Sequence, residues 1–93
     1  MPIYVDPIFK HGGSATFRWT ESCHMYADTL DELHAFAKQI GMKREWFQDH
    51  TRLPHYDLNV SRRKAAVRRG AIEQTREHLV SYMKPRNQER GQT

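Results

Sequence analysis

The segment Cys23–Gly41, which reads CHMYADTLDELHAFAKQIG, carries the two clearest secondary-structure signals of the chain. Its first residues alternate: Cys23, a methionine and an alanine fall on one face, while His24, Tyr26 and Asp28 fall on the other. A period of two is typical of a strand that has one face on an apolar core. We therefore predict a strand here, followed directly by a helix.

The helix is expected to begin at Thr29, because Thr29-Leu30-Asp31-Glu32 has the spacing of a capping box. In that arrangement the threonine hydroxyl accepts a hydrogen bond from the Glu32 amide, and the glutamate carboxylate accepts one from the Thr29 amide. Gly41 can adopt the left-handed conformation that ends many helices. The predicted buried stripe, flanked by Phe36, consists of Leu30, Leu33, Ala37 and Ile40.

Short strands are also predicted before this unit. Ile3–Asp6 is rich in β-branched and aromatic residues and lies between Pro2 and Pro7. Glycines indicate a turn at His11–Ser14, and Thr16–Trp19 is a candidate second strand.

The second half of the chain predicts a strand, a helix and a strand. The first strand is His55–Leu58, in which the histidine and Asp57 share a face. The helix has Asn59 or Ser61 as its cap, continues to about Arg69 and ends at Gly70, and the second strand is Ala71–Gln74. A crossover of this length makes two strands parallel and the connection right-handed.

Two more helical segments complete the pattern. Lys43–Gln48 is expected to form one or two turns in which Trp46 and Phe47 pack against the rest of the domain. A last helix opens at Thr75 and Glu77 and is expected to face inward with Leu79, Val80 and Met83.

The predicted fold is a small α/β domain, with a short mixed sheet of about four to five strands and about three to four helices. A chain of 93 residues accommodates one such domain, which we assign to residues 1–83. Residues 84–93 are expected to form a disordered basic tail. The chain has no apolar run long enough to span a bilayer and one cysteine, so no membrane segment, no intrachain disulfide and a cytoplasmic location are expected.

The charge of the chain is unevenly distributed. Residues 1–60 contain six bases and eight acids, net −2, whereas residues 61–93 contain nine bases and three acids, net +6. A basic half favours contact with phosphate on a nucleotide or on nucleic acid, although a merely solvated helix face gives the same pattern.

Imidazoles and carboxylates fall at the polar ends of the predicted strands, where open α/β sheets bind ligands. If these strands are neighbours, the groups can coordinate a divalent metal that polarises a phosphodiester or lowers the pKa of bound water. The candidate ligands are Asp6, His24, Asp28, His55 and Asp57. In the alternative interpretation the aspartates accept backbone amides and the histidines are hydrogen-bonded in a small core.

His34 lies on the buried side of its predicted helix. It is interpreted as a core histidine or, alternatively, as a side chain that points into the site. In its neutral state it has one donor and one acceptor, which suits a bridge from Asp6 or Asp57 to a second partner.

Arg63 is expected to point inward from the basic helix, because it shares a face with Ala66 and Val67. A buried arginine needs an anion, here Asp57, Asp28 or a ligand phosphate held by two hydrogen bonds. The bases expected to face water, and to neutralise phosphates if nucleic acid is the partner, are Arg62, Lys64, Arg68 and Arg69.

The bulky aromatic side chains can stack on bases or build the core. They are Trp19, Trp46, Phe47 and Tyr56, of which at most one or two are expected to contact a ligand. Cys23 lies on the apolar face of its strand and is expected to be a core residue.

Several short motifs of the chain resemble an uncharacterised domain family of bacteria and their phages. The similarity covers about residues 3–80 and rests on Ile3-Tyr4-Val5-Asp6, His11-Gly12, Cys23-His24-Met25 with Asp28, Glu32-Leu33-His34-Ala35-Phe36-Ala37, His55-Tyr56-Asp57-Leu58, Ala66-Val67 and Gly70-Ala71. Here Cys23-His24-Met25 stands where members have a Ser-His-Leu-like strand, and Leu58 replaces a valine. The resemblance implies a small standalone α/β domain, is compatible with a phage origin, and implies no reaction. It places His11, His24, His34, His55 and Asp57 at motif positions.

Three functional hypotheses follow. The first is binding of a phosphate-bearing ligand, a nucleotide above all, by Arg63 together with His11, His24, His34, His55, Tyr56 and Asp57; a phage accessory protein of this kind would sequester a host nucleotide. The second is a metal-dependent phosphodiesterase or nuclease that uses the candidate ligands named above. The third is a nucleic-acid-binding accessory protein that uses the outer basic face. Exposed strand edges are compatible with a homo-oligomer. No membrane partner is expected.

Overall fold

The strand expected at residues 23–28 is the centre of a mixed five-stranded sheet in the computed structural model, which describes residues 2–10 and 21–83. In chain order the elements are β1 (Ile3–Val5), β2 (Phe9–Lys10), β3 (Glu21–Ala27), α1 (Leu30–Gln39), the 3-10 turn η1 (Arg44–Trp46), β4 (Tyr56–Leu58), α2 (Val60–Arg68), β5 (Ile72–Glu73) and α3 (Arg76–Tyr82). The α/β class is thus confirmed. The turn expected at 11–14, the strand expected at 16–19 and the tail all lie outside the described residues.

β3 pairs antiparallel with β1, β2 and β4, and β1 pairs in parallel with β5. β1 and β4 are both antiparallel to β3, and β5 is parallel to β1. β4 and β5 therefore run in the same direction, as the strand–helix–strand pattern predicts. They are not neighbours, since β3 and β1 lie between them. In this register His24 lies opposite Asp57, and Met25 lies opposite both Val5 and Tyr56.

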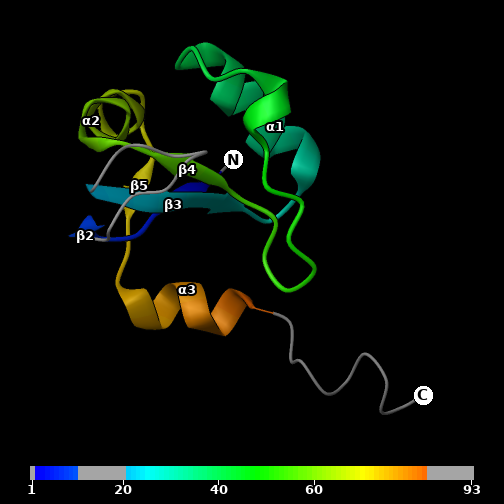
Figure 1. Cartoon of the computed structure of the whole chain (residues 1–93), viewed down its shortest axis with the longest axis vertical. Helices are drawn as coiled ribbons and strands as arrows, with labels where there is room; N and C mark the ends of the chain where they lie inside the picture. Colours follow the sequence, from blue (N-terminus) through cyan, green and yellow to red (C-terminus); the bar gives the residue numbers. More distant parts are fainter. Residues whose placement is uncertain (1, 11–20, 84–93) are drawn as a thin grey trace.

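Helices cover both faces of the sheet (Figure 1). On one face α1 and α2 enclose the main core, which includes Val5, Cys23, Met25, Leu33 and Leu58. On the other face α3 covers a smaller core of Tyr26, Leu53 and Leu79. The expectation that β3 has one buried face is therefore wrong: Tyr26 is fully buried because α3 packs on the side that the alternation marks as polar.

The helices begin at the expected caps. The Thr29 hydroxyl accepts a hydrogen bond from the Glu32 amide at 3.3 Å, and the Asn59 side chain accepts one from the Arg62 amide at 2.8 Å. Thr75 does the same for α3. These bonds satisfy amides that have no partner within the first turn of a helix.

The end of α1 differs from the prediction in one respect. Gly41 has the expected positive φ, 81°, but Arg62, which was expected to face water, donates through Nη1 to the Ile40 carbonyl at 2.5 Å. A Cβ atom on Gly41 would lie 2.6 Å from that nitrogen. Arg62 therefore holds the C-terminus of α1 against α2.

Three side chains expected in the core are exposed. Leu30 lies outside the buried stripe of α1, which is formed by Leu33, Ala37 and Ile40. Val80 is 55 % exposed, because α3 has only two turns and Leu79, next to it on the helix, occupies the contact with the sheet. Trp46 is 41 % exposed, since the segment expected to continue as a helix forms a single 3-10 turn, and its ring contacts the Lys43 ammonium instead.

Candidate metal centre

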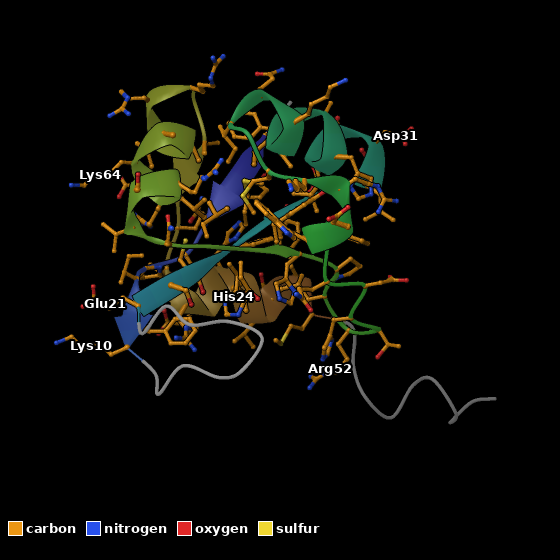
Figure 2. All side chains as sticks on the ribbon, turned by 45° about the horizontal axis from the view of Figure 1, so that its top comes forward. Lys10, Glu21, His24, Asp31, Arg52 and Lys64 are labelled. Carbon is orange, nitrogen blue, oxygen red and sulfur yellow. The ribbon has the colours of Figure 1, made fainter. Side chains whose placement is uncertain are left out.

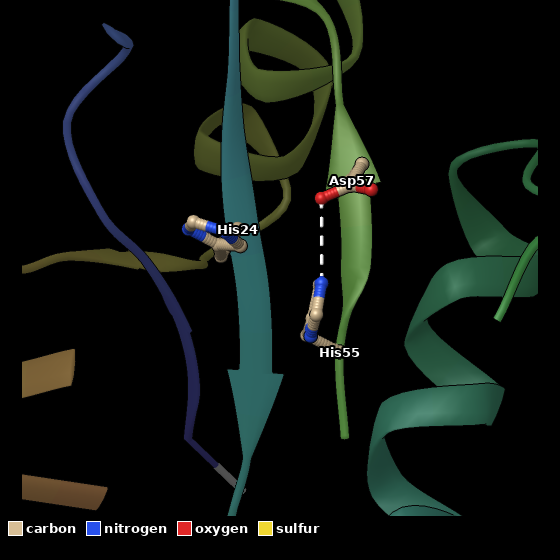
Figure 3. A group of neighbouring side chains, drawn as sticks. All are labelled: His24, His55 and Asp57. Carbon is tan, nitrogen blue, oxygen red and sulfur yellow. Dashed lines mark ion pairs between the residues drawn. The ribbon is translucent and has the colours of Figure 1, made fainter. Parts of the chain in front are cut away.

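Three side chains converge on the face of the sheet that α3 partly covers. One potential ligand atom from each of His24, His55 and Asp57 lies within 4.8 Å of the other two (Figure 3). His24 belongs to β3 and Asp57 to β4, where they are paired across the sheet. His55 precedes β4 by one residue and shares the face of Asp57 because side chains alternate along a strand.

His24 is held by Asp6, which follows β1 and is completely buried. One carboxylate oxygen of Asp6 accepts the backbone amide of His24 at 2.6 Å, and the other lies 2.9 Å from His24 Nδ1. A carboxylate accepts hydrogen bonds, so Nδ1 carries the proton and Nε2 has the lone pair. This carboxylate–histidine arrangement is the one that orients metal-binding imidazoles in many proteins.

His55 has the same tautomer for a different reason. Its Nδ1 lies 2.7 Å from the Leu53 carbonyl, which can only accept, so Nδ1 is the donor and Nε2 is directed to Asp57 Oδ1 at 3.4 Å. Burial lowers the pKa of His55, but the hydrogen bonds with Asp57 and Leu53 and the charges of Asp57 and Asp6 outweigh it and hold the pKa above its usual value. When His55 is protonated, it forms an ion pair with Asp57, and when it is neutral, its Nε2 has a lone pair.

Two imidazole nitrogens and one carboxylate oxygen form a donor set that binds Zn²⁺ and other divalent transition metals and leaves coordination positions for water or substrate. The two rings meet edge to face, with centroids 4.9 Å apart. A metal ion would replace the proton between His55 and Asp57, and the hydrogen bonds at both Nδ1 atoms could remain. The two histidines could therefore hold an ion while keeping their hydrogen bonds to Asp6 and the Leu53 carbonyl.

Phe9 and Arg76 border this cluster. The Phe9 ring stacks on His24 at 5.4 Å, and the Arg76 guanidinium carbon lies 5.1 Å from the Phe9 ring. Arg76 Nε is 3.8 Å from the Asp6 carboxylate. Arg76 is not among the site residues expected from the sequence, because it is the first residue of α3 and belongs to no motif.

Asp28, a predicted ligand, is not brought to the cluster. It follows the end of β3 and lies about 13 Å along the strand from His24. Its carboxylate accepts a hydrogen bond from the Tyr82 hydroxyl at 2.7 Å, and nearby Tyr26 is hydrogen-bonded to His78 at 2.8 Å. Asp28 therefore helps to dock α3.

His34 and Tyr56 lie on the opposite face of the sheet. Tyr56 alternates with His55 and Asp57, and its hydroxyl is 2.9 Å from His34 Nδ1. The His34 ring packs against Phe47 with centroids 4.6 Å apart, and burial followed by the charge of Arg44 lowers its pKa. The expected bridge from His34 to Asp6 or Asp57 is therefore absent, and its partner among the described residues is Tyr56.

Arg63 points inward as expected, with 17 % of its side chain exposed. Its anion is Glu73, at 3.2 Å, and not Asp57 or Asp28. Its Nε donates to the backbone carbonyl of Asp6 at 3.0 Å. Arg63 approaches from the α2 side, so it supports the backbone of the residue that holds His24 from the other side.

The remaining predicted residues lie away from the cluster. Lys64 and Arg68 of α2 are exposed, as is Arg69, the C-cap of this helix, and Lys64 points away from the sheet (Figure 2). Cys23 is buried as expected, and burial raises its pKa to about 12. His11 and Trp19 are outside the described part of the chain.

The chain is thus a small α/β domain with a candidate metal site formed by two histidines and one aspartate. The model of the family described as "Protein of unknown function (DUF4031)" matches residues 3–86, and the chain belongs to this family. No curated protein and no solved structure matches the chain. Within residues 2–10 and 21–83, no helix is long and apolar enough to cross a membrane.

Proposed function

We propose that this protein binds a divalent transition-metal ion at His24, His55 and Asp57 and hydrolyses phosphodiester bonds of a nucleotide or nucleic acid. The observation that carries the proposal is the shared tautomer of the two histidines. Both Nδ1 atoms have acceptors, Asp6 and the Leu53 carbonyl, so Nε2 holds the lone pair in each neutral ring, and the two histidines and Asp57 each have a ligand atom within 4.8 Å of the other two.

The charge of the site favours an anionic substrate. Two neutral imidazoles and one carboxylate leave a net positive charge on a bound divalent ion. Such an ion polarises a phosphoryl oxygen and lowers the pKa of water. In this proposal the chain itself orients the ligands: Asp6 fixes the His24 ring, and Leu53 fixes the His55 ring.

A nucleotide enters this proposal as substrate rather than as a ligand of Arg63. Arg63 is engaged by Asp6 and Glu73, and His34 with Tyr56 lies on the far face. The residues of the predicted nucleotide pocket that the structure describes are thus divided between the two faces of the sheet. We place the reaction in the cytoplasm, where nucleotides are abundant and a buried thiol such as Cys23 stays reduced.

The first test is calorimetric titration of the full chain with Zn²⁺ and Mn²⁺, followed by hydrolysis of bis(p-nitrophenyl) phosphate by the loaded protein. We expect one ion per chain, and loss of both binding and hydrolysis in His24→Gln and His55→Gln. His34→Gln is the matched control, because it removes a histidine from the other face, and it should bind and hydrolyse as the wild type. Equal binding by all three variants, or none by the wild type, would overturn the proposal.

A further inference from the structure

We propose that Arg76 is the residue that binds the anionic phosphoryl oxygens of the substrate and so selects phosphate esters over neutral esters. This inference rests on the proposed function. It concerns a side chain beside the candidate ligands, on the face of the sheet that carries them.

Arg76 is tied to the metal centre by a closed ring of contacts. Asp6 binds His24 Nδ1, the His24 ring stacks on Phe9, Phe9 lies under the Arg76 guanidinium, and Arg76 Nε faces Asp6 again at 3.8 Å. The aromatic contact restricts the long arginine side chain before any ligand binds. A restricted side chain loses less conformational entropy when it forms hydrogen bonds.

The two arginines next to Asp6 differ in the donors that they have left. Arg63 is 17 % exposed, and both its Nε and its Nη1 are bound to protein oxygens. Arg76 is 53 % exposed, and its contact with Asp6 is too long for a hydrogen bond. To the part of the chain that the structure describes, the Arg76 guanidinium makes no hydrogen bond, so its donors remain available to a ligand.

A guanidinium suits a phosphoryl group because its planar fork can bind two anionic oxygens at once. With the metal ion on one oxygen of the phosphoryl group, Arg76 can bind a second oxygen of the same group. A neutral carboxylic ester has no such anionic oxygen. Arg76 is therefore expected to act on phosphate esters specifically, whereas the metal ligands act on both kinds of substrate.

The test compares two substrates in the Zn²⁺-loaded full chain, bis(p-nitrophenyl) phosphate and the neutral ester p-nitrophenyl acetate. For Arg76→Gln we expect kcat/KM on the diester to fall about 10- to 100-fold, with most of the change in KM, while hydrolysis of the acetate changes less than about 2-fold. Arg76→Lys should recover part of the loss. Arg69→Gln, which removes an exposed arginine at the C-terminal end of α2, should behave as the wild type.

Direct binding gives a second readout that does not depend on turnover. Inorganic phosphate, titrated into the Zn²⁺-loaded protein, should bind more weakly to Arg76→Gln than to Arg69→Gln. If the variant binds zinc, melts as the wild type and keeps its diesterase activity and phosphate affinity, the role of Arg76 is overturned while the proposed function stands. If the wild type binds no metal, both proposals fall. An equal loss on both substrates would make Arg76 a structural residue.

Discussion

Asp6 binds His24 at two points, through the backbone amide at 2.6 Å and through Nδ1 at 2.9 Å. The backbone carbonyl of the same aspartate accepts a hydrogen bond from Arg63 Nε, and its carboxylate lies 3.8 Å from Arg76 Nε. One buried residue therefore fixes the position and the tautomer of a candidate metal ligand. Its own position is fixed by an arginine from the other side of the sheet.

Asp6→Asn should weaken metal binding by about 10- to 100-fold, because an amide holds the His24 tautomer less strongly than a carboxylate. Calorimetric titration with Zn²⁺ measures the change. Asp28→Asn is the matched control, since Asp28 is an aspartate of the same sheet that contacts Tyr82 instead. Unchanged affinity in a folded Asp6→Asn protein would show that His24 is not a ligand.

Arg63→Gln should lower the free energy of unfolding by about 1–3 kcal/mol, because it leaves the Asp6 carbonyl without its charged donor and breaks the bond to Glu73. Much of the Glu73 side chain is in water, so the loss comes mainly from the carbonyl. Urea denaturation measures it, and Arg69→Gln should be neutral. A stable Arg63→Gln protein that no longer binds phosphate would return Arg63 to the ligand site.

Gly41→Ala should destabilise the protein more than Gly70→Ala, and the difference should come from side-chain contacts. Both glycines have positive φ, 81° and 109°, so both substitutions cost about 1–2 kcal/mol of backbone strain. Only the Cβ at position 41 would meet a side chain, the Arg62 guanidinium at 2.6 Å, whereas position 70 has open space. In an Arg62→Met background the cost of Gly41→Ala should therefore decrease in thermal melts. An unchanged cost would show that the guanidinium moves aside freely.

Much of the local structure is readable from the sequence. Thr29 and Asn59 are recognisable caps, Gly41 a recognisable helix end, and the alternation at residues 23–28 a recognisable strand. Each of these features depends on side chains only a few residues apart, so the local sequence is enough to predict it. Tyr26 shows the limit, because its burial depends on the distant helix α3.

The composition of the site depends on strand register, which the local pattern does not specify. His24 and Asp57 meet because β3 pairs with β4 in one register, and a shift by one residue would move one of them to the other face. His34 and Tyr56 also belong to the sequence motifs, but they lie on the face of the sheet opposite the cluster. Arg76 lies beside the cluster because α3 packs on this face of the sheet. Arg63 contacts Glu73 because β5 pairs with β1.

The pH dependence of stability should reveal the partly buried environment of His34. Its pKa is lowered in the folded protein, so the unfolded chain binds more protons and stability falls as the pH decreases below about 6.5. His34→Gln removes this term. The stability difference between wild type and variant, from urea denaturation at pH 7.5 to 5, should therefore shift in favour of the variant as the pH falls. A difference independent of pH would mean that His34 is not desolvated.

Metal binding should stabilise the fold more as the pH rises, because the ion competes with the proton of His55. The pKa of His55 is raised, so in the metal-free protein its ion pair with Asp57 contributes stability below about pH 6.5, which is lost as the pH rises through the folded pKa. Metal competes with that proton at Nε2, so Zn²⁺ affinity should increase over the same rise in pH. At 100 times its dissociation constant, the ion should add about 2.7 kcal/mol to the free energy of unfolding. Melting curves with and without Zn²⁺ at pH 6 and pH 8 test this for the wild type and for His55→Gln. A shift that is equal at both pH values, or present in His55→Gln, would place the bound ion elsewhere on the protein.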